Sequence, residues 1–76
     1  MQVHLGGHLS WYDPDKRAWL EVAQPQPDTP RSVAERLGIP IGEIAITTVN
    51  RVLVDMEEVL VHDGDILEFY SPMGGG

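Results

Sequence analysis

The sequence has no cysteine, few basic residues and no long apolar run. Without cysteine, the chain has no disulfide scaffold, no thiolate metal site and no cysteine nucleophile. Five Lys and Arg residues stand against twelve Asp and Glu, and the formal net charge is −7. Because nucleic-acid binding needs clustered cations, we expect no nucleic-acid partner. No stretch approaches the roughly 18–20 apolar residues of a membrane-spanning helix, so we expect no membrane association.

Length and composition indicate one small domain. A chain of 76 residues can form one modest core. The hydrophobic fraction of 42% and the charged fraction of 22% are typical of globular proteins. The first residues lack the basic and apolar segments of a signal peptide, so we expect a cytoplasmic protein. An acidic chain also suits docking to a basic partner surface.

Two stretches of alternating apolar and polar residues predict an N-terminal β-hairpin. The alternation runs through residues 2–12 and resumes at residues 17–23, which is typical of strands with one buried face. Asp13-Pro14-Asp15-Lys16 predicts the intervening turn, and Gly6-Gly7 predicts a bulge or twist. The expected inward residues are Val3, Leu5, Gly7, Leu9, Trp11, Ala18, Leu20 and Val22.

A short helix is predicted in the middle of the chain. Ser32-Val33-Ala34-Glu35 matches a capping box, in which the serine hydroxyl and the glutamate satisfy free backbone N–H groups. Thr29 before Pro30 is an alternative start. Gly38 suits the left-handed residue after the last turn, and Pro40 prevents continuation, so we expect about two turns.

Three more strands are predicted in the second half of the chain. Residues 44–49 are mostly β-branched and apolar, which predicts a buried strand. A short strand is expected at residues 52–54 and a final strand at residues 66–70, which Pro72 ends. The expected turns are Asn50-Arg51 and Asp63-Gly64-Asp65.

This order of elements predicts a two-layer α+β domain. It is the order expected of a β-grasp, or ubiquitin-like, fold: a mixed sheet of four to five strands with one short helix across one face. We expect the β-grasp domain at residues 1–71 and a flexible, Gly-rich C-terminal tail at residues 72–76.

The second half of the sequence contains a recognisable series of motifs. Val49-Asn50 ends a strand, Asp63-Gly64-Asp65 precedes the last strand, and Phe69-Tyr70-Ser71-Pro72 leads to Gly75-Gly76. In their order and spacing, these motifs resemble the MoaD and ThiS family of sulfur carriers. The likeness is greatest to MoaD, the small subunit of molybdopterin synthase, and it covers about residues 46–76.

The chain departs from the family pattern at certain positions. Arg51 stands where the family often has glycine, Ser71 replaces the first proline of the MoaD ending, and Gly74 precedes the final glycine pair. These departures bear on the pathway more than on the family.

The resemblance implies a sulfur carrier and not an enzyme. In this family an activating enzyme uses ATP to adenylate the C-terminal carboxylate, here that of Gly76, and a sulfur donor converts it to a thiocarboxylate. The implied acceptor is the molybdopterin synthase large subunit, or thiazole synthase in thiamine synthesis. The chain would bind no cofactor and supply no catalytic residue. Gly74, Gly75 and Gly76 form the tail, and glycine backbone can thread a narrow channel because it has no Cβ.

Two other classes of function remain open. A ubiquitin-like modifier would join Gly76 to lysines of other proteins, and a β-grasp interaction module would have an idle tail.

Adjacent strand residues face opposite sides, so one of the two aromatics at residues 69 and 70 belongs to the core. Trp11 and Trp19 can be divided in the same way. The candidate docking residues are Phe69, Tyr70, Pro72, Met73, Leu53 and Met56.

No metal site is predicted. His4 and His8 would lie about 13 Å apart on one strand, too far to share an ion. His62, Asp63 and Asp65 fall in a tight turn, whose Gly64 favours turn geometry over ion binding.

Overall fold

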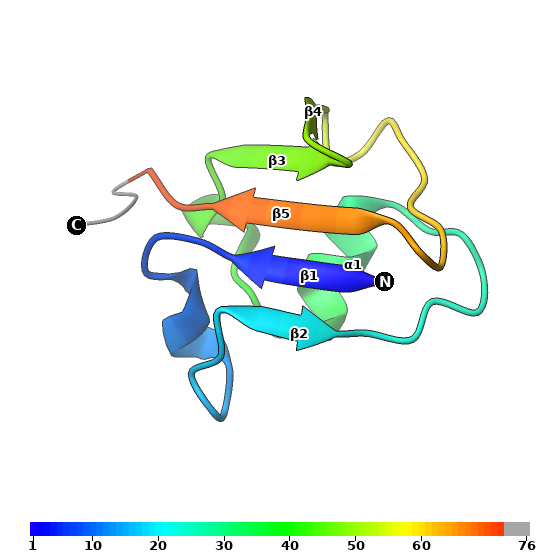
Figure 1. Ribbon diagram of the computed structural model, residues 1–76. Coiled ribbons are helices and arrows are strands. Elements are labelled where there is room, and N and C mark those ends of the chain that lie inside the picture. Colours follow the sequence, from blue (N-terminus) through cyan, green and yellow to red (C-terminus); the bar gives the residue numbers. More distant parts are fainter. Residues whose placement is uncertain (73–76) are drawn as a thin grey trace.

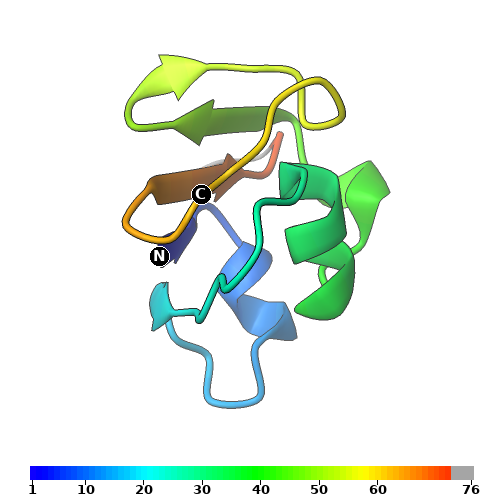
Figure 2. The same ribbon diagram turned by 90° about the vertical axis from the view of Figure 1, so that its right-hand side faces the viewer.

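A computed structural model describes residues 1–72 and has a mixed five-stranded sheet with a short α-helix against one face (Figures 1 and 2). The helix α1 spans Pro30–Arg36. The strands are β1 (Gln2–Leu5), β2 (Trp19–Glu21), β3 (Ile46–Val49), β4 (Val52–Leu53) and β5 (Ile66–Tyr70), and the 3-10 helices are η1 (Leu9–Tyr12) and η2 (Ile41–Glu43). The two-layer α+β prediction is therefore confirmed, and the arrangement is compatible with a β-grasp.

The last strand lies in the middle of the sheet. The strand order is β2-β1-β5-β3-β4, with β5 parallel to β1 and antiparallel to β3. The outer strands β2 and β4 pair antiparallel with β1 and β3. The last strand, β5, thus has a neighbour on each side, whereas β2 and β4 form the two edges (Figure 1).

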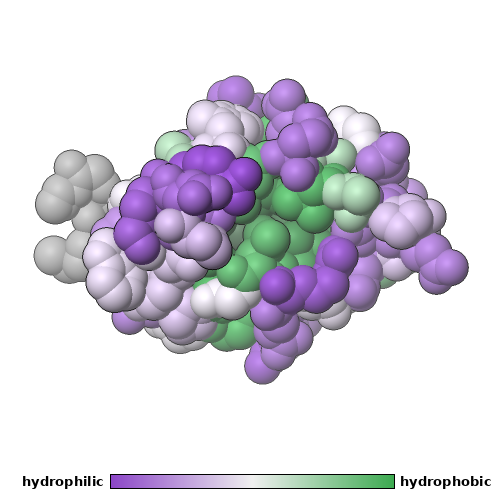
Figure 3. Space-filling view, turned by 90° about the horizontal axis from the view of Figure 1, so that it is seen from below, coloured by the Kyte–Doolittle hydropathy of each residue, from purple (hydrophilic) through white to green (hydrophobic). Residues whose placement is uncertain are grey.

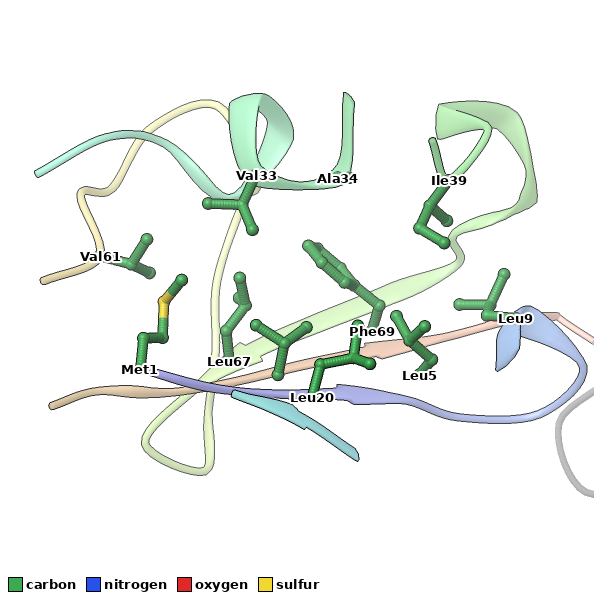
Figure 4. Close-up of a cluster of buried hydrophobic side chains, with 11 residues drawn as sticks. Met1, Leu5, Leu9, Leu20, Val33, Ala34, Ile39, Val61, Leu67 and Phe69 are labelled. Atoms are coloured by element: carbon green, nitrogen blue, oxygen red, sulfur yellow. The ribbon is translucent and has the colours of Figure 1, made fainter. Parts of the chain in front are cut away.

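The core fills the space between the sheet and α1. Alternate residues of β1 and β5 point toward the helix, as expected for strands with one buried face (Figure 4). Phe69 and Leu67 are fully buried there, opposite Val33 of α1. Burying a side chain of this kind contributes about 1.5–3 kcal/mol. The buried apolar residues are Met1, Val3, Leu5, Leu9, Leu20, Val33, Ala34, Ile39, Val61, Leu67 and Phe69.

The prediction of a strand over residues 2–12 is wrong beyond Leu5. Gly7 takes a positive φ of 62°, and the chain then turns into η1, where Leu9 is buried but Trp11 is 67% exposed. The second strand is also shorter than residues 17–23, and Ala18 is exposed. The hairpin itself is confirmed, since β1 and β2 pair antiparallel. Its predicted turn is closed by the Lys16 N–H, which donates to the Asp13 carbonyl at 3.0 Å.

The alternative helix start at Thr29 is confirmed, and the capping box at Ser32 is wrong. Thr29 has an extended φ of −76° and ψ of 152°, and its side chain accepts a hydrogen bond from the Ser32 N–H at 3.2 Å. Pro30 occupies the first turn, where its missing N–H costs nothing. Gly38, with φ of 76°, ends the helix as predicted.

Two of the predicted turns are joined by side-chain hydrogen bonds. Asn50, at a positive φ of 51°, donates through Nδ2 to Asp65 Oδ1 at 3.0 Å. Its Oδ1 accepts from the Ile66 N–H at 2.9 Å. Asp65 also accepts from the His62 N–H at 2.7 Å. The Val-Asn and Asp-Gly-Asp motifs therefore have a structural role, because together they fix where β5 begins.

Replacing Asn50 by Ala will lower the free energy of unfolding by about 1–3 kcal/mol. Two hydrogen bonds are lost, each contributing about 0.5–1.5 kcal/mol, and alanine is strained at a positive φ. Asn50→Gly is the matched control, since it removes the same bonds but tolerates this φ. Urea unfolding should rank wild type above Gly and Gly above Ala. Equal stability of all three proteins would remove the structural role assigned to this residue.

Candidate functional site

The end of β5 is held from both sides until the chain reaches the surface. The Gly6 N–H donates to the Phe69 carbonyl and the Ala45 N–H to the Tyr70 carbonyl, both at 2.8 Å. The Ser71 side chain is buried, and its Oγ accepts from the His8 N–H at 3.3 Å. Pro72 is exposed. The backbone is thus positioned up to Ser71, and everything beyond starts from a fixed point.

The predicted tail residues Met73, Gly74, Gly75 and Gly76 lie outside the described residues. Their expected projection from the body and the proposed division at residue 72 therefore stay predictions. What the described part defines is the segment from which that tail begins.

The face of the sheet that α1 does not cover, called the open face below, presents a row of cross-strand neighbours. The backbone register aligns one residue from each strand across the whole sheet. Neighbours of this kind interact directly, because their Cβ atoms lie about 4.5–5.5 Å apart. The row consists of Trp19, His4, Glu68, Thr48 and Leu53.

Glu68 occupies the centre of the row and is only 4% exposed. Its Oε1 accepts from the Thr48 hydroxyl at 2.9 Å, and its Oε2 accepts from the Tyr70 hydroxyl at 2.7 Å. Arg51 Nε lies 3.4 Å from Oε1, although the Arg51 side chain is itself mostly exposed. Glu68 therefore ties β3, β5 and the β3–β4 turn together beneath the surface of the open face.

The charge of Glu68 is stabilised by these neighbours. Burial by itself would raise the pKa of Glu68, but the hydrogen bonds from Tyr70 and Thr48, with the positive charge of Arg51 and the influence of His4, outweigh it and hold the pKa below its usual value. The hydrogen bond to Glu68, together with burial, raises the pKa of the Tyr70 hydroxyl. The pair is therefore a neutral phenol donating to a carboxylate.

Tyr70 is also fixed by its ring contacts. A Cβ on Gly6 would lie 2.7 Å from Tyr70 Cε1, so the ring packs on backbone that only glycine allows. The His4 ring meets the Tyr70 ring edge-on at 5.5 Å and lies 4.5 Å from the Trp19 ring. Gly6 thus has a steric role that the predicted bulge did not include.

The structure separates the predicted docking residues. Phe69 is wrong as a docking residue because its side chain points into the core and is fully buried. Tyr70 is half-buried on the open face, and Leu53 is 71% exposed on β4. Met56 is half-buried and lies by the helix, where its carbonyl accepts from the Arg31 N–H at 3.0 Å. Of these residues, Tyr70 and Leu53 share one face and Met56 does not.

Some apolar residues of the sheet are exposed, and this was not predicted from the sequence. Ile46 is 47% exposed beside Tyr70, and Val52 is 63% exposed on β4. The prediction of a buried strand at residues 44–49 is therefore wrong for residues 44 and 45, which precede β3, and for exposed Ile46. Trp11 and Trp19 are both exposed, and neither enters the core. Alternation outward from buried Thr47 would have placed Ile46 and Thr48 on the same open face.

Replacing Tyr70 by Phe will raise the pKa of Glu68 and lower stability near neutral pH by about 1.5–3 kcal/mol, the range for a hydrogen bond to a charged group. Because the folded pKa of Glu68 lies below its ordinary value, this contribution is present above about pH 4.5 and fades as pH falls through the folded pKa. Carboxyl-carbon NMR titration and urea unfolding measure the two effects. Tyr12→Phe is the control, since its partner Glu43 is partly exposed, and its effect should be smaller.

The described residues form neither a metal cluster nor a membrane-spanning helix. Within residues 1–72, no group of three or more His, Cys, Asp or Glu residues is placed to hold a metal ion. The His62–Asp65 segment is a hydrogen-bonded turn. No helix in this part of the chain combines the length and apolar character needed to cross a membrane.

The open face and the end of β5, with Ser71 and Pro72, therefore form the candidate site. They place Tyr70 and exposed Ile46 at the point where the chain leaves the sheet, with buried Glu68 two residues earlier on β5. Comparison of the chain with known protein-family models, curated proteins and solved structures gives no match.

Proposed function

We propose that this chain is a β-grasp sulfur carrier, and that its working group is the carboxylate of Gly76. The proposal takes Gly76 as the last residue of the mature chain. Its main support is the geometry of β5, a central strand whose end is held at Ser71 and which is followed in the sequence by exposed Pro72, Met73 and the glycine run. The motif resemblance to the MoaD and ThiS family adds the chemistry.

The proposed reaction has two steps. In the first, a carboxylate oxygen of Gly76 attacks the α-phosphorus of ATP within an activating enzyme, forming an acyl adenylate and releasing pyrophosphate. In the second, a sulfur donor at the level of sulfide attacks the acyl carbon and displaces AMP, leaving a thiocarboxylate. The sulfur then passes to an acceptor, for which molybdopterin synthesis is our first proposal and thiazole synthesis the alternative.

The sequence of the tail suits a carrier whose partner supplies the active site. A glycine run has no Cβ atoms, so it can approach ATP closely inside a narrow channel. Residues 71–76 can extend about 20 Å at ~3.3 Å per residue, enough to reach into a partner. The open face carries Tyr70 and Ile46 beside the end of β5 and Leu53 farther away on β4, and it offers a surface for docking.

Intact-mass measurement of the chain from its native cells tests this function. The chain is captured with an antibody, without a tag on either end, and analysed under conditions that preserve thioacids. A sulfur carrier will show a fraction heavier by the exchange of one oxygen for sulfur. A fraction alkylated by iodoacetamide supports the same assignment, because the cysteine-free chain has no other thiolate.

The same sample distinguishes the alternatives. If Gly76 is joined to lysines of other proteins and no thioacid is found, the chain is a protein modifier. If the tail is unmodified and can be removed without loss of function in the cell, the chain is an interaction module.

A further inference from the structure

One edge of the sheet carries free backbone hydrogen-bonding groups. β2 is the outermost strand next to β1, with no strand beyond it in residues 1–72 (Figure 1). Its pairing with β1 includes hydrogen bonds from the Val22 N–H to the Met1 carbonyl and from the Leu5 N–H to the Ala18 carbonyl, both at 2.8 Å. In an antiparallel pair, hydrogen-bonded positions alternate. Leu20 therefore bonds to β1, whereas the N–H and C=O groups of Trp19 and Glu21 point outward.

A hollow accompanies this edge. It has a volume of about 300 Å³ and is lined by Gln2, Trp19, Leu20 and Glu21. The molecule seen from the β2 side has hydrophobic surface in its centre, with hydrophilic surface around it (Figure 3). Trp19 is 47% exposed although it lies in a strand. An edge with free hydrogen-bonding groups, a hollow beside it and an exposed tryptophan can accept an added strand.

The charge beside the edge favours a basic partner. The Glu21 side chain is 74% exposed and the Asp63 side chain 75% exposed, and both carboxylates contact the single ammonium of Met1. One negative charge is therefore in excess here. None of the ion pairs formed by Lys or Arg in residues 1–72 involves Glu21 or Asp63. A second copy of the chain would bring the same carboxylates and another net charge of −7, which opposes self-pairing.

We propose that the β2 edge binds an extended segment of a partner protein as a sixth strand. Paired residues on neighbouring strands share a face. The partner residues opposite Trp19 and Glu21 are therefore two positions apart and lie on the side of Gln2. An aliphatic residue opposite Trp19 fills the hollow, and a Lys or Arg opposite Glu21 pairs with its carboxylate. The recognised pattern is one apolar and one basic residue separated by one residue. This binding is separate from the chemistry of the tail and does not depend on it.

The test selects linear peptides from a random displayed library against the full chain, then follows synthetic versions of the enriched peptides by NMR and calorimetry. Enriched sequences should carry the apolar and basic residues two apart, and their binding should shift the amide resonances of Trp19 and Glu21. Methylation of a peptide nitrogen that faces the edge should weaken binding about tenfold or more, because a hydrogen bond is lost and the strands are forced apart. Methylation of the next nitrogen, which faces away, should have little effect.

Variants of the chain give a second test. Glu21→Pro removes an outward N–H but no bond to β1, and proline is tolerated in this orientation on an edge strand. Glu21→Gln is its control, since it removes the charge and keeps the N–H. The proline variant should bind clearly more weakly than the glutamine variant, and Trp11→Ala, an exposed tryptophan outside the hollow, should bind normally.

Several results would overturn the proposal. These are a library without enrichment, peptides that shift Ile46 and Leu53 instead, and equal tolerance of both methylated peptides. A chain that dimerises through β2 in sedimentation experiments would replace the partner segment by a second copy. None of these outcomes bears on sulfur loading at Gly76.

Discussion

If the chain is the proposed sulfur carrier, deleting Gly76, or adding one residue after it, will abolish its sulfur loading. Either change moves the terminal carboxylate by about 3–4 Å along the tail. A misplacement of even ~1 Å can reduce the rate of a positioned reaction about a hundredfold. Because the tail starts from a fixed point at Ser71, a rearrangement within the domain cannot compensate for a shorter or longer tail. Intact-mass measurement of the loaded fraction, in cells that express each variant, gives the result directly.

A substitution within the tail distinguishes the effect of tail length from the effect of a side chain in the partner's channel. Gly75→Val keeps the length but adds a β-branched side chain, which obstructs a narrow channel and restricts the backbone. Gly75→Ala is the smaller control and should retain more loading. Both variants should unfold like wild type in urea, since the apolar core of the described residues is formed within residues 1–69. Normal loading of the shortened or lengthened chain would mean that Gly76 is not the reacting group.

Replacing Phe69 by Ala will lower the free energy of unfolding by about 3–5 kcal/mol, the usual cost of removing a buried aromatic ring. Phe69 is fully buried between β5 and the helix side of the domain. The total free energy of unfolding of a protein domain is about 5–15 kcal/mol, so this variant loses a large part of its stability. The ring has no exposed surface, and any loss of partner binding by this variant would follow from unfolding. Urea unfolding measures the change.

Leu53→Ala is the matched control for the core variant. Leu53 is 71% exposed on β4, and surface substitutions of this kind change stability by about 0.5 kcal/mol or less. If the open face docks partners, this variant should keep its stability and lose affinity for the activating enzyme. A stable Phe69→Ala protein would contradict the assignment of Phe69 to the core.

Local patterns predicted the second half of the fold well. β5 has the predicted bounds, and the turns at Asn50-Arg51 and Asp63–Asp65 form where residue chemistry favours them. These elements depend on alternation and on positive φ, which are properties of a few neighbouring residues. The motifs also interact with each other, and this could not be read from either motif alone.

The first third was predicted less well for a physical reason. The alternation at residues 2–12 continues past the real end of the strand, so periodicity alone gives no stop signal. The strand ends because Gly7 turns the chain and the backbone of Gly6 supports the Tyr70 ring, which lies far away in sequence. A contact of this range is set by the tertiary fold and not by local propensity.

The candidate site was predicted in part. Alternation required Phe69 and Tyr70 to face opposite sides, but only the packing shows which of them enters the core. The buried carboxylate of Glu68 was missed, because its partners Thr48 and Arg51 come from another strand and a turn. The edge position of β2 was likewise not predicted, because it depends on the strand order of the whole sheet.

Transfer of oxygen from Gly76 to AMP tests the central claim most directly. The chain is prepared with heavy oxygen in its terminal carboxylate and incubated with its activating enzyme, ATP and sulfide. If the carboxylate is adenylated and sulfide then displaces AMP, the AMP will carry one heavy oxygen and the chain will gain sulfur in equal amount. AMP without the label, or sulfur gained without AMP, would contradict the account.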